Sequence, residues 1–117
     1  MADFIIYRGD TVVLSVTVTV KEEEYSLVGA EIWFTAKPSY STLDAAAQFQ
    51  KTIGDGIAVT DAAKGKFTVT ISATDTYSMA SSKTILLYDC QVKESGGNVY
   101  TIASGNIIVM PDVTRAT

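Results

Sequence analysis

The feature that most constrains the fold of this chain is the alternating stretch at residues 11–20, TVVLSVTVTV. One face of this stretch carries Val12, Leu14, Val16, Val18 and Val20. The other face carries hydroxyl residues, except at Val13. Successive side chains of a strand point to opposite sides of a sheet. The pattern therefore predicts a strand with one face in a core and the other in water.

Similar short strands are expected along the rest of the chain, at residues 4–7, 30–37, 48–53, 57–60, 66–72, 84–94 and 99–110. Pro38 ends one of them, Ser95-Gly96-Gly97-Asn98 forms a hairpin turn, and Thr74 caps a single helical turn. No helical segment of ten to fifteen residues separates the strands, which disfavours a parallel α/β sheet. We predict an all-β fold, an immunoglobulin-like antiparallel β-sandwich of about 7–8 strands, with a small closed barrel as the second choice.

The size and hydropathy of the chain indicate one globular domain over residues 1–117. Hydrophobic residues make up 47% of the sequence, and none of their runs approaches the length of a membrane span. The N-terminus has no basic start, and its apolar run FIIY is too short for a secretory signal. We expect no membrane association and synthesis in a cytoplasm.

The charge balance argues against nucleic acid as a partner. Nine basic residues stand against 13 acidic ones, the net charge is −4, and the basic residues are scattered singly. The chain has one cysteine, Cys90, so no intrachain disulfide forms. Cys90 falls at an inward position of its expected strand, and we interpret it as a buried, unreactive thiol.

No constellation of catalytic residues is evident, and we expect a protein that is not an enzyme and holds no metal or cofactor. The sequence contains no histidine, which removes the commonest general base and metal ligand. The carboxylates that a glycoside hydrolase would need all fall in predicted turns, at Glu22, Glu23, Glu24, Asp55, Asp61 and Asp75. Hydrolysis is therefore the third-ranked hypothesis.

The tripeptide Arg8-Gly9-Asp10 has two interpretations. Some cell-adhesion ligands display these three residues to integrins, but so short a motif occurs often by chance. Between two expected strands, Gly-Asp also serves as a turn. We favour the turn.

The aromatic residues supply the candidate interaction surface. Trp33 is out of phase with the inward residues of its strand, so it faces away from the main core or is covered by the loop at residues 39–47. We name Trp33, Tyr40 and Tyr77 as the candidate residues, with Tyr25 and Tyr100 as further members. Such a group is suited to a protein interface or to stacking on sugars, and the sequence does not decide between them.

Several segments, taken in order, resemble one family. They are Arg8-Gly9-Asp10-Thr11, Leu27 to Lys37 (LVGAEIWFTAK), Asp55-Gly56-Ile57, Gly65 to Val69 (GKFTV), Tyr88 to Val92 (YDCQV), Thr101 to Val109 (TIASGNIIV) and Asp112 to Arg115 (DVTR). In these segments the chain resembles the N-terminal domain of baseplate upper proteins of tailed phages and small related prophage proteins.

The resemblance implies an Ig-like module in a phage or prophage virion. Such a protein is made in the bacterial host cytoplasm and docks on tail, baseplate or fibre proteins, and a second copy of itself is a further partner. Because the chain stops at Thr117, we expect a free-standing virion protein, an accessory of the tail or head, or a fragment of something longer. Either residues 4–7 or the strand ending at Met110 is expected to extend sheets across subunits. The alternative function is a carbohydrate-binding module that uses the exposed aromatics.

Overall fold

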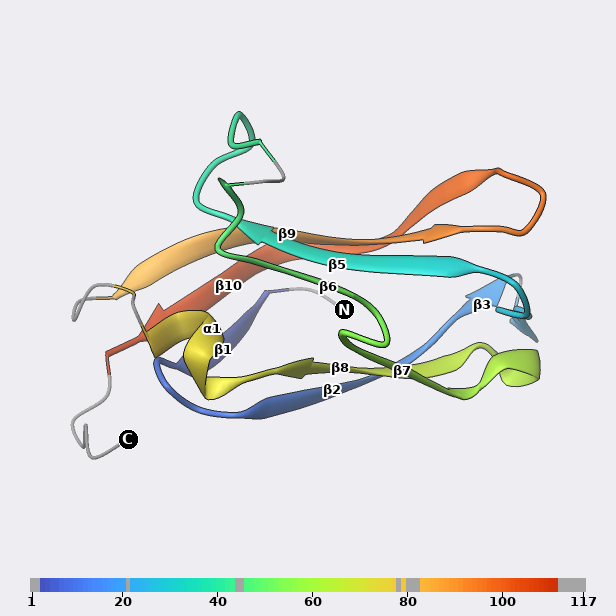
Figure 1. Cartoon of the computed structure of the whole chain (residues 1–117), viewed down its shortest axis with the longest axis horizontal. Coiled ribbons are helices and arrows are strands. Elements are labelled where there is room, and N and C mark those ends of the chain that lie inside the picture. The colour runs from blue at the N-terminus through green and yellow to red at the C-terminus, as the bar shows by residue number, and fades with distance from the viewer. Residues whose placement is uncertain (1–2, 21, 44–45, 78, 80–82, 112–117) are drawn as a thin grey trace.

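The chain folds almost entirely into β-strands. The computed structural model describes residues 3–20, 22–43, 46–77, 79 and 83–111. The strands are β1 (Phe4–Tyr7), β2 (Val12–Thr17), β3 (Thr19–Val20), β4 (Glu23–Glu24), β5 (Glu31–Lys37), β6 (Phe49–Ile53), β7 (Gly56–Asp61), β8 (Lys66–Ile71), β9 (Thr84–Lys93) and β10 (Val99–Met110). Helical structure in these ranges includes α1 (Ala73–Tyr77) and the 3-10 turn η2 (Ala62–Lys64) (Figure 1).

Eight of the strands form one mixed sheet that is nearly closed into a barrel. Their order is β1-β10-β9-β5-β6-β7-β8-β2, and β3 and β4 form a separate two-stranded ribbon. Figure 1 shows β9, β5 and β10 in one layer and β2, β8 and β7 in the other. Strand β6 runs from the first layer toward the second and meets β7 there, so the two layers belong to a single sheet.

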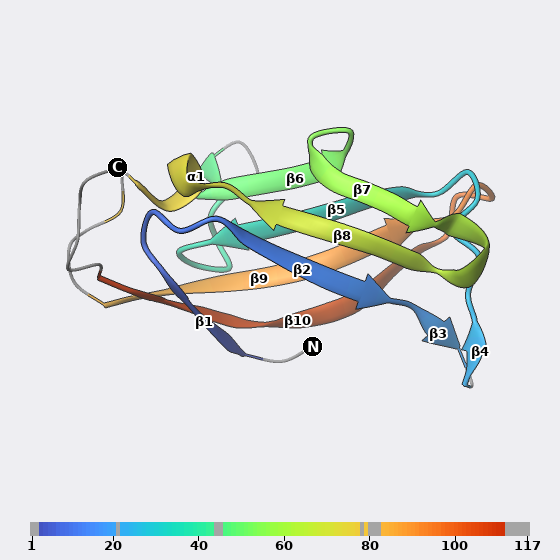
Figure 2. The ribbon, with the colours of Figure 1, turned by 90° about the horizontal axis from the view of Figure 1, so that it is seen from below.

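The connection between β1 and β2 explains why the sheet curls. These strands are consecutive in the chain but stand at opposite ends of the sheet order. In a flat sheet with a strand spacing of 4.8 Å, they would lie about 34 Å apart. The chain from Tyr7 to Val12 reaches about 18 Å at most. The two ends of the sheet must therefore approach each other, and in Figure 2 β1 and β2 are joined by one tight turn.

The all-β prediction is confirmed, whereas the expected antiparallel pairing is only partly right. β1 pairs with β10 in parallel, and so does β6 with β7, through Thr52–Gly56 and Ile53–Ile57. The nearly closed sheet is closer to the small barrel that was our second choice than to two separate antiparallel layers. The reason is that β6 and β7 bond to each other at the point where a sandwich would have a gap.

The core follows the predicted alternation in most strands, but Val20, which was expected on the core face, is 49% exposed in β3. Ile32, Phe34 and Ala36 of β5 are buried, as expected from their phase. The Phe34 ring stacks on Tyr88 of β9, with ring centroids 5.3 Å apart. Beside it, Cys90 is fully buried, and burial, assisted by the nearby Asp89 charge, raises the pKa of its thiol to about 12. The thiol therefore stays protonated at neutral pH, as a residue of the core.

The Arg8-Gly9-Asp10 segment is a structural turn at one end of the barrel. The Arg8 side chain is only 4% exposed and donates from Nη1 to the Met79 carbonyl at 2.7 Å. The Gly9 N–H donates to Thr76 Oγ1 of α1 at 2.9 Å. The turn thus fastens the β1–β2 connection to the segment that follows β8, and its arginine is not displayed for adhesion.

Several local expectations are corrected by the structure, among them the turn expected at Glu22 to Glu24, where Glu23 and Glu24 form β4. The expected strand at residues 11–20 is divided at Val18 into β2 and β3. The bulge of β10 lies between Thr101 and Ala103, not at Ser104-Gly105-Asn106. The helix α1 begins before Thr74, and its first turn is stabilised by the Asp75 carboxylate, which accepts from the Ser72 N–H at 2.7 Å.

Gly65 holds the junction between β2, β3 and β8. Its φ is +71°, and its carbonyl accepts from the Val18 N–H at 2.8 Å. A Cβ at this position would lie 2.5 Å from the Tyr25 carbonyl oxygen and 2.6 Å from that of Val18. Only glycine fits both the backbone conformation and the close approach.

We therefore predict that Gly65→Ala destabilises the protein clearly more than Gly97→Ala. Gly97 has a φ of +97° but open space around its Cα, so its substitution should cost only the left-handed conformation, about 1–2 kcal/mol. At Gly65 the clash should add about 2 kcal/mol. Urea unfolding of both variants measures the difference, and equal losses would contradict this account of the junction.

Candidate functional site

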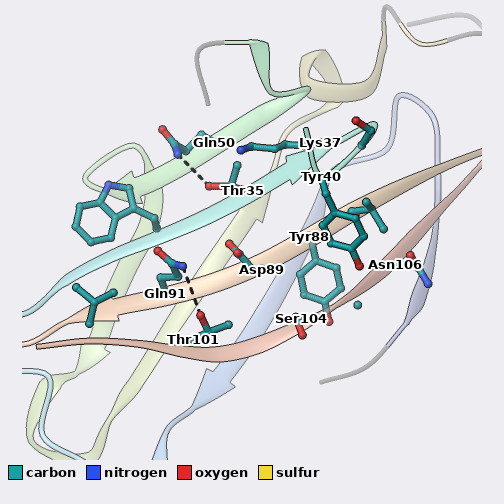
Figure 3. A pocket seen from close by; sticks show the side chains of 15 residues that line it. Thr35, Lys37, Tyr40, Gln50, Tyr88, Asp89, Gln91, Thr101, Ser104 and Asn106 are labelled. Carbon is teal, nitrogen blue, oxygen red and sulfur yellow. Dashed lines mark hydrogen bonds between the residues drawn. The ribbon is translucent and has the colours of Figure 1, made fainter. Parts of the chain in front are cut away.

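The candidate site is a hollow on the outer face of the sheet, which we call the outer hollow. The hollow is open to solvent and has a volume of about 800 Å³. It lies over β6, β5, β9 and β10 (Figure 3). Its lining comes mainly from the outward positions of these strands, together with Ser39 and Tyr40 of the loop that follows β5. The inward positions of the same strands form the core, so one sheet supplies both.

Strand register arranges the lining in rows across the sheet. The residues paired side by side are Trp33, Gln91 and Thr101; then Gln50, Thr35, Asp89 and Ser104; then Lys37, Leu87 and Asn106. Neighbouring strands stand about 4.8 Å apart, and this distance sets the spacing of the side chains within a row. The sheet backbone is rigid, and it fixes the spacing between rows.

Side-chain amides and hydroxyls share this surface with apolar side chains such as Trp33, Leu87 and Val99. Gln50 Nε2 donates to Thr35 Oγ1 at 2.9 Å, and Gln91 Nε2 donates to Thr101 Oγ1 at 3.4 Å (Figure 3). Each glutamine keeps its carbonyl oxygen and a second N–H for other partners. The charged residues of the lining are Lys37 and Asp89, one of each sign. The outer hollow is thus suited to a neutral ligand rich in hydrogen-bonding groups.

The structure brings together two of the three aromatic residues that the sequence analysis named. Trp33 is half-buried in the first row, and Tyr40, 89% exposed, lines the same hollow from the loop. Tyr77 lies elsewhere, on α1, and is 47% exposed. Trp33 does face away from the core, as its phase predicted. The expected group of three is therefore a pair, because α1 does not reach this face.

The further tyrosines also lie apart from the outer hollow. The Tyr25 hydroxyl donates a short hydrogen bond to the Glu94 carboxylate at the far end of the sheet. This bond is the main cause that raises the pKa of Tyr25 to about 12, with burial and the Glu94 charge adding to it. Tyr25 thus ties β4 to the β9–β10 hairpin. Tyr100, about half exposed, lies in β10 on the side opposite Thr101.

The acidic residues of the described ranges form no metal-binding group. No three side chains of His, Cys, Asp or Glu lie close enough there to hold a metal ion. Asp75 is engaged in an ion pair with Lys51 at 2.7 Å, and Lys51 also lies 5.9 Å from the Phe49 ring centroid. None of the helices in this part of the chain has the length and apolar character that a bilayer crossing requires.

Comparison with known proteins adds no assignment. No protein-family model matches the chain, and no curated protein is detectably related to it.

Sequence reasoning missed the polar half of the outer hollow. Gln50, Gln91 and Asn106 each stand at an outward strand position, and alternation alone gave that phase. The missing information was that β9 pairs with both β5 and β10, which unites residues more than 50 positions apart. Without that pairing, these polar residues looked like ordinary solvent-facing positions.

We predict that acrylamide quenches the fluorescence of the native protein to an intermediate degree. Trp33 is the single tryptophan of the chain, so emission excited at a wavelength that the six tyrosines do not absorb reports on the outer hollow alone. Its quenching constant should lie between that of the protein unfolded in guanidinium and that of a buried indole. Absence of quenching in the native state would place Trp33 in the core and contradict the described face.

Proposed function

We propose that this protein is a phage or prophage virion structural protein that docks on tail, baseplate or fibre components. In this proposal it is not an enzyme and needs no cofactor. Its partners are other virion proteins and a second copy of itself, rather than nucleic acid or a membrane. It is made in the bacterial host cytoplasm and ends in the virion.

The observation that carries the proposal is the position, in this fold, of the residues in which the chain resembles baseplate upper proteins. Arg8 is buried and bonded to Met79, and Gly9, Gly29 and Gly65 have φ values of 83°, 75° and 71°. All four belong to the segments in which the chain resembles baseplate upper proteins. The likeness therefore falls on positions where this fold requires a particular residue, which supports a shared architecture over a chance match of strand patterns.

We further propose that the nearly closed sheet is an immunoglobulin-like arrangement of the variable type. If the sheet is divided at the short β6–β7 contact, its two parts are β2-β8-β7 and β10-β9-β5-β6. In chain order these correspond to B-E-D and G-F-C-C′, the strand orders of the two layers of that fold. This correspondence supports the sandwich that the sequence favoured, with β1 added in parallel beside β10.

The virion proposal predicts that the protein sediments with phage particles. A tagged copy, expressed in the strain that encodes the chain, should be found in gradient-purified particles after induction and detected there by mass spectrometry. A folded control domain of similar size with the same tag should stay at the top of the gradient. If the tagged protein stays there as well, the proposed virion role is wrong.

A second candidate function is carbohydrate binding in the outer hollow. The observation that favours it is the position of Trp33 beside rows of amides and hydroxyls. An indole offers a flat apolar face to the C–H side of a sugar ring, and amides bind its hydroxyls. The single charges of opposite sign, Lys37 and Asp89, suit a neutral glycan.

This candidate predicts that a neutral oligosaccharide from a glycan array changes Trp33 fluorescence on binding. Trp33→Ala and Gln91→Ala should each weaken binding at least tenfold, measured by calorimetry. Tyr77→Ala is the matched control, because Tyr77 is an exposed aromatic outside the hollow, and it should change binding less than twofold. Binding that survives Trp33→Ala would exclude this site.

A further inference from the structure

Strand β2 has a free edge. In the described chain it pairs with β8 alone. Val18, which follows β2, donates to the Gly65 carbonyl and accepts from the Tyr25 N–H, both on the β8 side. Backbone groups of a strand alternate in direction, so Val12, Leu14 and Val16 also bond toward β8. The N–H and C=O groups of Val13, Ser15 and Thr17 therefore point to the open edge.

The open edge of β2 faces the uncovered half of β10. β1 pairs with β10 only from Ile107 to Met110. The next N–H of β10 on that edge, the Asn106 N–H, donates to the Asp3 carboxylate at 2.9 Å. Before that point, Ile102 and Ala103 border an open cavity of about 170 Å³, whose other wall is Ser15 to Val18. We call this gap the β2–β10 seam. It is the place where the nearly closed barrel stays open.

The two walls of the seam differ in how they are protected. β10 has a bulge between Thr101 and Ala103, a device that turns an edge away from pairing. β2 has no bulge, and residues 11–20 contain no charged residue and no proline. Its core-facing residues Val12, Leu14 and Val16 are only partly buried. An added strand would bond the free backbone groups and cover these side chains.

The charges around the seam indicate what kind of strand fits. Asp10 is exposed at one end of β2, and Glu22 and Glu23 are exposed at the other, beyond β3. The chain as a whole carries a charge of −4. A second copy of this chain would bring the same acidic ends, which would repel those of β2. A second globular domain would also have to fit where the strands β10 and β1 lie beside the free edge of β2 (Figure 2). A lone extended segment meets neither obstacle.

We propose that the β2–β10 seam binds an extended segment of a partner protein by strand addition. The segment alternates apolar and hydroxyl residues and is flanked by lysine or arginine. Its backbone pairs with Val13, Ser15 and Thr17, its apolar side chains cover Leu14 and Val16, and its basic ends meet Asp10 and Glu22. This inference rests on the proposed function in one respect: if the virion role holds, the partner is a virion protein.

A synthetic peptide tests this site directly. The probe is a fluorescein-labelled peptide with the sequence KKTVTVTVTKK, and binding to the full chain is measured by anisotropy. We expect saturable binding that Ser15→Pro weakens at least tenfold. The Ser15 N–H points out of the β2–β8 ladder, so proline removes a docking group without breaking the native sheet. Ser15→Thr is the matched control and should bind within twofold of the original protein, and thermal unfolding checks that both variants fold.

Two further readouts separate the alternatives. Hydrogen exchange should show fast amides at Val13, Ser15 and Thr17 in the free protein, and their protection when the peptide is bound. Glu22→Gln with Glu23→Gln should weaken binding severalfold. A failure of the peptide to bind, or binding that is indifferent to Ser15→Pro, overturns the proposal. So does a dimer in sedimentation equilibrium that Ser15→Pro dissociates, because the occupant is then a second copy.

These outcomes are distinguishable from a failure of the virion role. If Ser15→Pro enters phage particles as well as the original protein does, the seam is not the docking site but the virion role stands. If the peptide binds as predicted and the protein is absent from particles, the seam stands and the virion role is wrong.

Discussion

The short connection between β1 and β2 is the constraint on which the rest of this structure depends. It joins two strands that stand at opposite ends of an eight-stranded sheet, and so the sheet has to curl until its ends meet. Arg8, Gly9 and Asp10 make the connection, and bonds from Arg8 to Met79 and from Gly9 to Thr76 hold it against the segment after β8. Loss of these bonds would leave a buried carbonyl without its donor, which costs about 1–3 kcal/mol.

Closure at one end leaves the opposite end less constrained. At the closed end, Gln48 of the segment before β6 donates to the Asp75 carbonyl at 2.8 Å, and Lys51 pairs with the Asp75 carboxylate. Both sheet layers are therefore tied to α1. Toward the other end β1 no longer covers β10, and β2 continues into the β3–β4 ribbon instead of pairing with β10. The β2–β10 seam is the direct result of a β1 that is only four residues long.

The two candidate surfaces work by different chemistry. The outer hollow presents side chains, namely Trp33 and rows of amides and hydroxyls, on a rigid sheet face. The seam presents backbone groups of β2 and a partly covered apolar face. Side chains on a sheet face can select a small polar ligand, whereas a free strand edge selects extended protein. The two surfaces adjoin along β10, because Thr101 and Ser104 line the outer hollow and Ile102 and Ala103 line the seam.

The sequence by itself determined most of the strands, their inward faces and the hairpin turn, although it merged β2 with β3 and placed Glu23 and Glu24 of β4 in a turn. Alternation placed Phe34 and Cys90 in the core and Trp33 outside it, because side-chain direction in a strand is a local property with a period of two residues. The hairpin at residues 95–98 followed from its glycines, of which Gly97 has the positive φ.

Only the tertiary structure decided which strands are neighbours. The parallel pairing of Phe4 with Ile107, the union of Gln50, Gln91 and Asn106 in one hollow, and the free edge at Ser15 all depend on contacts between distant segments. The period of two is the same in parallel and antiparallel strands, and at an edge as in the centre of a sheet. The pattern that reveals a strand therefore carries no information about its partners, which are set by chain connectivity and by the packing of the whole core.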